Sequence, residues 1–278
     1  VQWEIAENVW LWPHERLKRQ IVEAGLLGKI THARLTYASG AYHGFNALRM
    51  ILGSEPQRVL GYAQAVDTLP YLNYGGQLET TRWWESGIIE FENGVTCLFE
   101  MPPAPGARGS HWEVEGTHGY LSGSELVLFR NGTQARFPFR DVYEAVDGDK
   151  TLAAVCVDTD PPLVWENPFK RYKISHADDI AKASILRSLY RAVTENVPPA
   201  YGAANARRDM ELWIALRESA RRGSVWLDLP LTEETDIERL IRTEYLRRYE
   251  ADPVHSTDKL LRAPFNRLSV MWTVAGWL

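Results

Sequence analysis

The chain has 278 residues, of which 45% are hydrophobic and 24% are charged, and its formal net charge is −5. This length and composition predict one large domain, or one domain with an appendage, around a full hydrophobic core. The negative charge argues against a nucleic-acid-binding protein, which would normally carry a basic face. No apolar run approaches the roughly 20 residues of a membrane span, and no signal-peptide pattern is present. With two cysteines, a reducing, cytoplasmic location is expected.

The first 25 residues predict a strand from Trp3 to Trp12 and then, after Pro13, an amphipathic helix that ends at Gly25. A βα unit that binds a dinucleotide needs glycines in its turn, so that backbone amides can approach a pyrophosphate. The turn here reads Trp-Pro-His-Glu, and no glycine-rich phosphate-binding motif follows anywhere. We therefore expect this chain alone to bind no nucleotide. Because it starts without methionine inside the predicted strand, we also expect an earlier half to have been removed or to exist as another polypeptide.

Apolar periodicity and turn residues predict the remaining elements. Strands are expected over 29–37, 58–66, 87–92, 95–101, 111–115, 119–122, 126–130 and 134–139, and Asn93-Gly94 and Asn131-Gly132 are expected to form tight turns. Helices are expected over 42–52, from 175 to about 193, over 203–222 and over 233–250, followed by an apolar tail over 268–278. We divide the chain into a domain over 1–230 and a helical extension with the tail over 231–278.

This order of elements predicts an α+β fold, an open, mixed and mainly antiparallel sheet with helices on one face. Two neighbouring strands carry apolar residues on both faces, among them Ile88, Ile89, Cys97 and Leu98. A sheet with one face in water would show cleaner alternation. We therefore expect another subunit to cover the second face, in a homodimer or homotetramer. The apolar tail is expected to pack across a neighbour or back onto its own core.

Several stretches resemble the C-terminal half of the Gfo/Idh/MocA oxidoreductases, the glucose-fructose oxidoreductase and inositol dehydrogenase family. No single stretch is specific, but their order and spacing are. The matching stretches are 7–13, 17–30, 42–49, 94–95, 112–121 and 209–220. The resemblance implies a mixed-sheet domain that binds a small sugar or polyol, pairs with an N-terminal Rossmann domain and oligomerises through its sheet.

Departures from the family pattern concern the catalytic groups. The glycine-rich turn and the lysine of the Glu-Lys-Pro motif belong to the Rossmann half and do not occur here. The motif Asp-x-x-x-His falls on Ser39 and His43, so a hydroxyl replaces the carboxylate. The resemblance implies the substrate-binding part of an NAD(P)-dependent oxidoreductase acting on a sugar or polyol, with NAD or NADP held by a Rossmann domain supplied elsewhere. The departures keep a second hypothesis open, a catalytically inactive sugar-binding or scaffold module.

His43 is the candidate catalytic residue. It falls in the first turn of a predicted helix, where the helix dipole favours the neutral imidazole. A neutral imidazole can accept the proton of a substrate hydroxyl as a hydride leaves. A capping or core histidine is the alternative. Ser39 and Asn46 are candidate substrate-binding residues, the latter because a spacing of three places it on the same helical face.

Three further residues are candidates for contact with substrate. By the family match, Asn8 and Trp10 face the substrate, whereas Glu7 could be an ordinary charge at a strand end. Trp84 follows a loop over 71–76 and could stack on a sugar ring, although paired tryptophans more often pack in a core or an interface. His111, Glu113 and Glu115 alternate on one strand face, but no metal-ligand spacing supports them, so no metal is expected.

Overall fold

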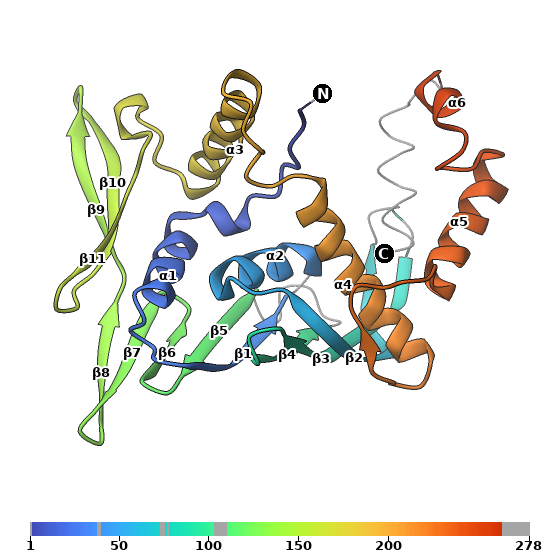
Figure 1. Ribbon diagram of the computed structural model, residues 1–278, viewed down its shortest axis with the longest axis horizontal. Helices are drawn as coiled ribbons and strands as arrows, with labels where there is room; N and C mark the ends of the chain where they lie inside the picture. The colour runs from blue at the N-terminus through green and yellow to red at the C-terminus, as the bar shows by residue number, and fades with distance from the viewer. Residues whose placement is uncertain (1, 38–39, 73–75, 77, 103–109, 263–278) are drawn as a thin grey trace.

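The computed structural model describes residues 2–37, 40–72, 76, 78–102 and 110–262 (Figure 1). Nine strands form one open sheet in the order β12-β2-β3-β4-β1-β5-β6-β7-β8. The pair β1 and β4 is parallel, and the other neighbouring pairs are antiparallel. The α+β class with an open, mainly antiparallel sheet is therefore confirmed. The strand bounds are β1 Ile30–Thr36, β2 Pro56–Leu72, β3 Leu78–Phe91, β4 Thr96–Met101, β5 His111–Gly116, β6 Gly119–Ser122, β7 Glu125–Arg130, β8 Thr133–Pro138 and β12 Leu227–Asp228.

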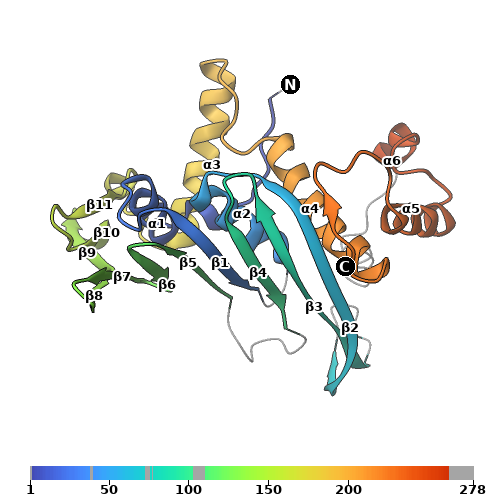
Figure 2. The same ribbon diagram turned by 60° about the horizontal axis from the view of Figure 1, so that its bottom comes forward.

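Helices cover one face of this sheet and leave the other bare, as Figures 1 and 2 show together. The helical elements are η1 Val9–Leu11, α1 Pro13–Glu23, α2 Ala41–Leu52, η2 Lys170–Tyr172, α3 Ala177–Thr194, α4 Ala203–Arg221, α5 Asp236–Tyr249 and α6 Thr257–Arg262. One hydrophobic core joins the covered face to the helices, because alternate strand residues point toward them. Its members include Leu17, Ile21, Leu35, Phe45, Leu48, Val59, Ile89, Phe99, Val114, Leu212 and Leu216.

The closest contact between layers is made by α4 on β2. An added Cβ at Gly61 would lie 1.8 Å from the backbone oxygen of Leu216, and Gly87 is the register partner of Gly61 on β3. The Gly61 amide also donates a 2.8 Å hydrogen bond to Ser219 Oγ. Two facing glycines thus let the helix backbone approach the strand backbone directly.

A second sheet of three strands was not predicted. It has the order β11-β10-β9, with bounds Arg140–Val146 for β9, Asp149–Val157 for β10 and Leu163–Glu166 for β11. The hairpin between β9 and β10 turns at Asp147 and Gly148, whose φ angles are 47° and 85°. This sheet packs near α1 and adds Leu152, Val155 and Trp165 to the core.

Two predictions about strands were wrong. Residues 2–8 are irregular and lead into η1 instead of forming a strand, because no strand among the described residues pairs with them; Ile5 N donates to Tyr201 O. The strands β2 and β3 are longer than expected and pair as far as Leu72 and Leu78, so Tyr71 and Leu72 of the predicted loop belong to β2, whereas residues 73–75 of that loop lie outside the described residues.

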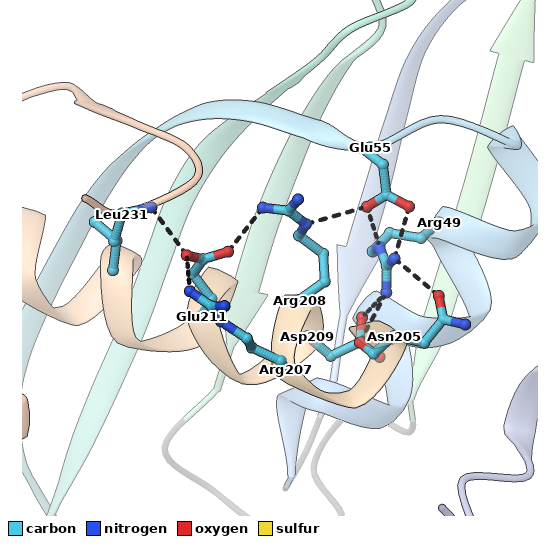
Figure 3. A network of polar contacts seen from close by, with 8 residues as sticks. All are labelled: Arg49, Glu55, Asn205, Arg207, Arg208, Asp209, Glu211 and Leu231. Carbon is cyan, nitrogen blue, oxygen red and sulfur yellow. Dashed lines mark hydrogen bonds and ion pairs between the residues drawn. The ribbon is translucent and has the colours of Figure 1, made fainter. Parts of the chain in front are cut away.

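Arg49 is the centre of a buried polar network between α2 and α4 (Figure 3). Its side chain is 3% exposed and donates to Asp209 Oδ1 at 2.6 Å and to both carboxylate oxygens of Glu55 at 2.7 and 2.9 Å. Burial raises the pKa of Asp209 to about 7, against the lowering effect of Arg49. The network continues through Arg208 to Glu211, which accepts a hydrogen bond from the backbone of Leu231. It therefore fixes how α2 and α4 pack together.

The C-terminal part begins with α5, near the expected position. Thr235 and Glu238 form a capping box at its start, which satisfies two backbone amides. The predicted apolar tail over 268–278 lies outside the described residues. Among the residues that the structure describes, no helix is both long and apolar enough to cross a membrane.

Candidate functional site

His43 lies in the first turn of α2, as predicted. The preceding Gly40 has φ +63°, and a Cβ there would come within 3.1 Å of His43 Cδ2. Glycine at this position therefore adds no side chain of its own against the Cδ2–Nε2 edge of the imidazole. The His43 side chain is 34% exposed, so a small molecule can reach this histidine.

The carboxylate of Glu7 contacts the Nδ1 side of the His43 ring. His43 Nδ1 lies 2.8 and 2.7 Å from the two carboxylate oxygens of Glu7, whose side chain is 7% exposed. The backbone N–H of Asn8 also donates to Glu7 Oε1 at 3.2 Å. A carboxylate accepts hydrogen bonds, so it favours the tautomer with the proton on Nδ1 and leaves Nε2 as an acceptor. This is the arrangement of a general base oriented by an acidic partner.

Aromatic rings surround the histidine. The ring centroids of Tyr42 and Tyr37 lie 4.1 and 6.0 Å from that of His43. Burial, together with the charge of Glu7, raises the pKa of Tyr37 to about 12 and raises the pKa of Tyr42. Both phenols are therefore neutral near pH 7 and available as hydrogen-bond donors. Tyr37 also stacks on Trp112 of β5, with an interplanar angle of 18°.

Three predicted substrate residues lie beside the pair of Glu7 and His43. The side-chain amide of Asn8 donates to Asp178 at the start of α3. Trp10 donates its indole N–H to the backbone oxygen of Glu7 and its backbone N–H to Asn46 Oδ1, at 3.2 and 3.3 Å. Asn46 is fully buried. These contacts fix η1 against α2, and a contact with substrate stays a prediction for each of the three.

The other two predicted residues do not join this group. Trp84 lies on the bare face of the sheet, because the next residue, Glu85, contacts Trp213 of α4 on the covered face and successive strand residues alternate between faces. There Trp84 meets Tyr62 edge to face at 5.9 Å. Ser39 lies outside the described residues. Glu7, expected as an ordinary charge at a strand end, belongs to the site, and so do Tyr37 and Trp112, which no sequence pattern indicates. The position of Glu7 beside Asn8 in the family-like stretch is the one signal that points to it.

The start of α1 does not offer a site for a pyrophosphate. A pyrophosphate binds to free amides at a helix start, but α1 begins with Pro13, which has no N–H, after Trp12 in an extended conformation. Across residues 2–262, apart from the undescribed gaps, no group of three or more histidine, cysteine, aspartate or glutamate side chains could hold a metal ion. His111, Glu113 and Glu115 make ion pairs with neighbours on the bare sheet face instead.

No protein-family model and no curated protein matches this sequence. Its fold is nevertheless similar to solved oxidoreductases. One, from Agrobacterium radiobacter in complex with NAD+, L-tartaric acid and magnesium, is 15% identical with a TM-score of 0.55, over 82% of this chain and 65% of that one. Aldose-aldose oxidoreductase from Caulobacter crescentus, complexed with glycerol, is 15% identical with a TM-score of 0.50, over 82% and 64%.

Levoglucosan dehydrogenase in complex with NADH is 18% identical with a TM-score of 0.55, over 81% of this chain and 65% of that one. The chain thus spans a little less than two thirds of the length of these three structures. Similarity at this level of identity establishes a fold shared with NAD-binding oxidoreductases, including a sugar dehydrogenase. It assigns no substrate or activity to this chain.

Proposed function

We propose that this chain is the substrate-binding and oligomerisation part of an NAD(P)-dependent oxidoreductase that acts on an alcohol group of a sugar or polyol. The observation that carries the proposal is the reachable imidazole of His43, held by the buried carboxylate of Glu7. The fold shared with NAD-binding oxidoreductases supports the reaction class. The proposal assigns 1–230 to the substrate domain and 231–278 to an extension.

In this proposal, His43 Nε2 accepts the proton of the substrate hydroxyl. Glu7 orients the ring through Nδ1 and stabilises the imidazolium that forms. The neutral phenols of Tyr37 and Tyr42 donate hydrogen bonds beside the ring. NAD or NADP, as hydride acceptor, would be held by a nucleotide-binding domain outside these residues, since α1 begins with Pro13, which has no N–H for a pyrophosphate.

A catalytically inactive sugar-binding or scaffold module is the second candidate. The hydroxyl of Ser39, at the position where the family pattern has a carboxylate, favours it. Titration calorimetry with NAD+, NADP+, glucose and myo-inositol tests what both candidates share. We expect at least one polyhydroxy compound to bind and neither nucleotide to do so; nucleotide binding by this chain alone would contradict both. Turnover by the native polypeptide then separates an enzyme from an inactive module.

We also propose that the bare face of the sheet is an interface between two copies. A row of apolar residues crosses it in register, with Leu60 opposite Ile88 and Ile88 opposite Leu98, and Tyr62 and Trp84 extend the row. Leu98 is 52% exposed. A contiguous apolar patch of this kind on a sheet is typical of an interaction surface.

Sedimentation of two variants with matched exposure tests this interface. The intact chain is expected to be a dimer or tetramer at micromolar concentration, and Leu98→Arg is expected to shift it to monomer, because the interface would bury an unpaired charge. Leu240 on α5 is also 52% exposed, so Leu240→Arg serves as the control and should sediment like the parent. A monomeric parent chain, or an unchanged oligomer for Leu98→Arg, would show that the sheet face is not the interface.

A further inference from the structure

A cavity of about 480 Å³ lies beside α1, and none of the residues predicted for the active site lines it. Its walls come from α1, β5, the turn between β6 and β7, the β9–β10 hairpin and the start of α3 (Figure 1). Ligand sites in proteins commonly have volumes of about 300–1,000 Å³. Neither His43 nor Glu7 lines it, and the stacked rings of Tyr37 and Trp112 lie between it and His43. The cavity is therefore a separate candidate site.

A buried ion pair forms part of its wall. Lys18 and Glu15 are 4% and 5% exposed, and Lys18 Nζ lies 2.8 Å from Glu15 Oε1. Glu15 Oε2 accepts the indole N–H of Trp112 at 2.6 Å, and Lys18 Nζ lies 4.9 Å from the centroid of that ring. Within the described residues, Glu15 is the one hydrogen-bond acceptor of Lys18, so two of the three ammonium N–H groups have no protein acceptor. A buried ammonium group with unsatisfied N–H groups is costly, so a ligand oxygen that accepts from Lys18 would be favoured here.

A second polar group lies on the more open wall. His14 Nδ1 is 2.8 Å from Ser124 Oγ, and His14 Nε2 is 2.9 Å from Asp141 Oδ1. Both ring nitrogens are engaged, so the ring is fixed. Asp141 is 39% exposed, and its Oδ2, which accepts a 3.4 Å hydrogen bond from the Tyr143 hydroxyl, has a second lone pair for a further donor. This wall therefore offers an acceptor, whereas the Lys18 side offers donors.

The balance of charge selects the class of ligand. Lys18 is already paired with Glu15 inside the cavity wall, and the carboxylate of Asp141 beside the His14 ring adds a negative charge. An anionic ligand that took Lys18 would leave the buried carboxylate of Glu15 without its cation, at a cost of several kcal/mol. Hydroxyl groups can instead accept from Lys18 and donate to Asp141 without separating either pair. Leu152, Val155 and Pro13 supply apolar surface for C–H groups.

We propose that this cavity binds a neutral polyhydroxylated ring compound, such as a pyranoside. The proposal does not depend on oxidoreductase activity. Calorimetric titration with methyl β-D-glucoside and with D-glucuronate tests it, because the two probes share a pyranose ring and differ in charge. The neutral glycoside is expected to bind at least about tenfold more tightly, a difference of about 1.4 kcal/mol. Equal affinity for the two probes, or no binding of the glycoside, would overturn the proposal.

Two variants locate the binding. The double variant Glu15→Gln with Lys18→Met removes both charges, so no lone buried charge remains, and Asp141→Ala changes the open wall without touching the buried pair. Each is expected to weaken glycoside binding at least about tenfold, with thermal melting confirming that the variants fold. If both fold and bind normally while His43→Asn does not bind, the glycoside occupies the His43 site. That result would overturn the cavity proposal and leave the proposed function standing.

Discussion

Replacing Arg49 with methionine is expected to lower the free energy of unfolding by about 3–5 kcal/mol, the usual cost of breaking a buried ion pair from one side. Asp209 would remain 2% exposed without a cation. Burial already raises the pKa of this carboxyl to about 7 while Arg49 is present. In the folded variant, the Asp209 carboxyl would therefore keep its proton above pH 4, whereas in the unfolded chain the same carboxyl loses it near pH 4. Stability of the variant should fall as the pH rises from about 4, because the folded state then binds more protons. Urea denaturation at several pH values measures both effects.

The matched control is the double variant Arg49→Met with Asp209→Leu. It removes the uncompensated charge and leaves Glu55, whose side chain is 41% exposed, to be solvated by water. Most of the lost stability should return, since an apolar pair of similar volume often replaces a buried ion pair without loss. A single variant that costs less than about 1 kcal/mol, or a double variant no more stable than the single one, would mean that the network does not hold α2 against α4.

Gly61→Ala is expected to cost about 3 kcal/mol or more, at the upper end for overpacked positions. The new Cβ would lie 1.8 Å from the backbone oxygen of Leu216, and backbone on both sides cannot move aside as a flexible side chain can. The helix α4 must then lift from β2, which also breaks the hydrogen bond from Gly61 N to Ser219. Thermal or urea unfolding of the purified variant measures the loss.

Gly202→Ala is the comparison for this effect. Gly202 precedes α4 with φ −84°, and its added Cβ would meet Pro199 Cγ at an ordinary 3.4 Å. We expect a change below about 1 kcal/mol, the size of an altered helix cap. If the two alanine variants were equally stable, the close approach of α4 to β2 would not be a requirement of the fold.

Local sequence patterns predicted most of the large sheet. Asn93-Gly94 marked a hairpin that the structure confirms, with Gly94 at φ 83° as the last residue of a three-residue loop closed by a hydrogen bond from Phe91 N to Val95 O. The dipeptide Asp147-Gly148 is an equally strong hairpin signal, and both of its residues have positive φ. The hairpin of β9 and β10, and therefore the second sheet, could have been predicted from it. Residues 2–8 had the composition of a strand, but a strand also needs a partner, which the described chain does not provide.

The candidate site could be predicted in part. His43 was found from its place at a helix start within a family-like stretch. Its partner Glu7 lies 36 residues away, and that contact depends on how η1 packs against α2, which no local pattern reports. Lys18 illustrates the same limit, because a lysine on an amphipathic helix is normally expected in water, whereas packing against Trp112 buries it here.

The most direct test of the account is sugar-dependent reduction of NAD+ or NADP+ by the native polypeptide that carries this chain, purified from its own cells and compared with variants of the same polypeptide. His43→Asn is expected to lower kcat by about 10²- to 10⁴-fold, the usual contribution of a general base. Glu7→Gln should lower kcat less and leave KM within a few-fold, since Glu7 acts through His43. His255→Asn, between α5 and α6, is the control and should match the parent. A kcat in His43→Asn that equals that of the parent would contradict the account. So would a native polypeptide that reduces neither nucleotide with any sugar or polyol.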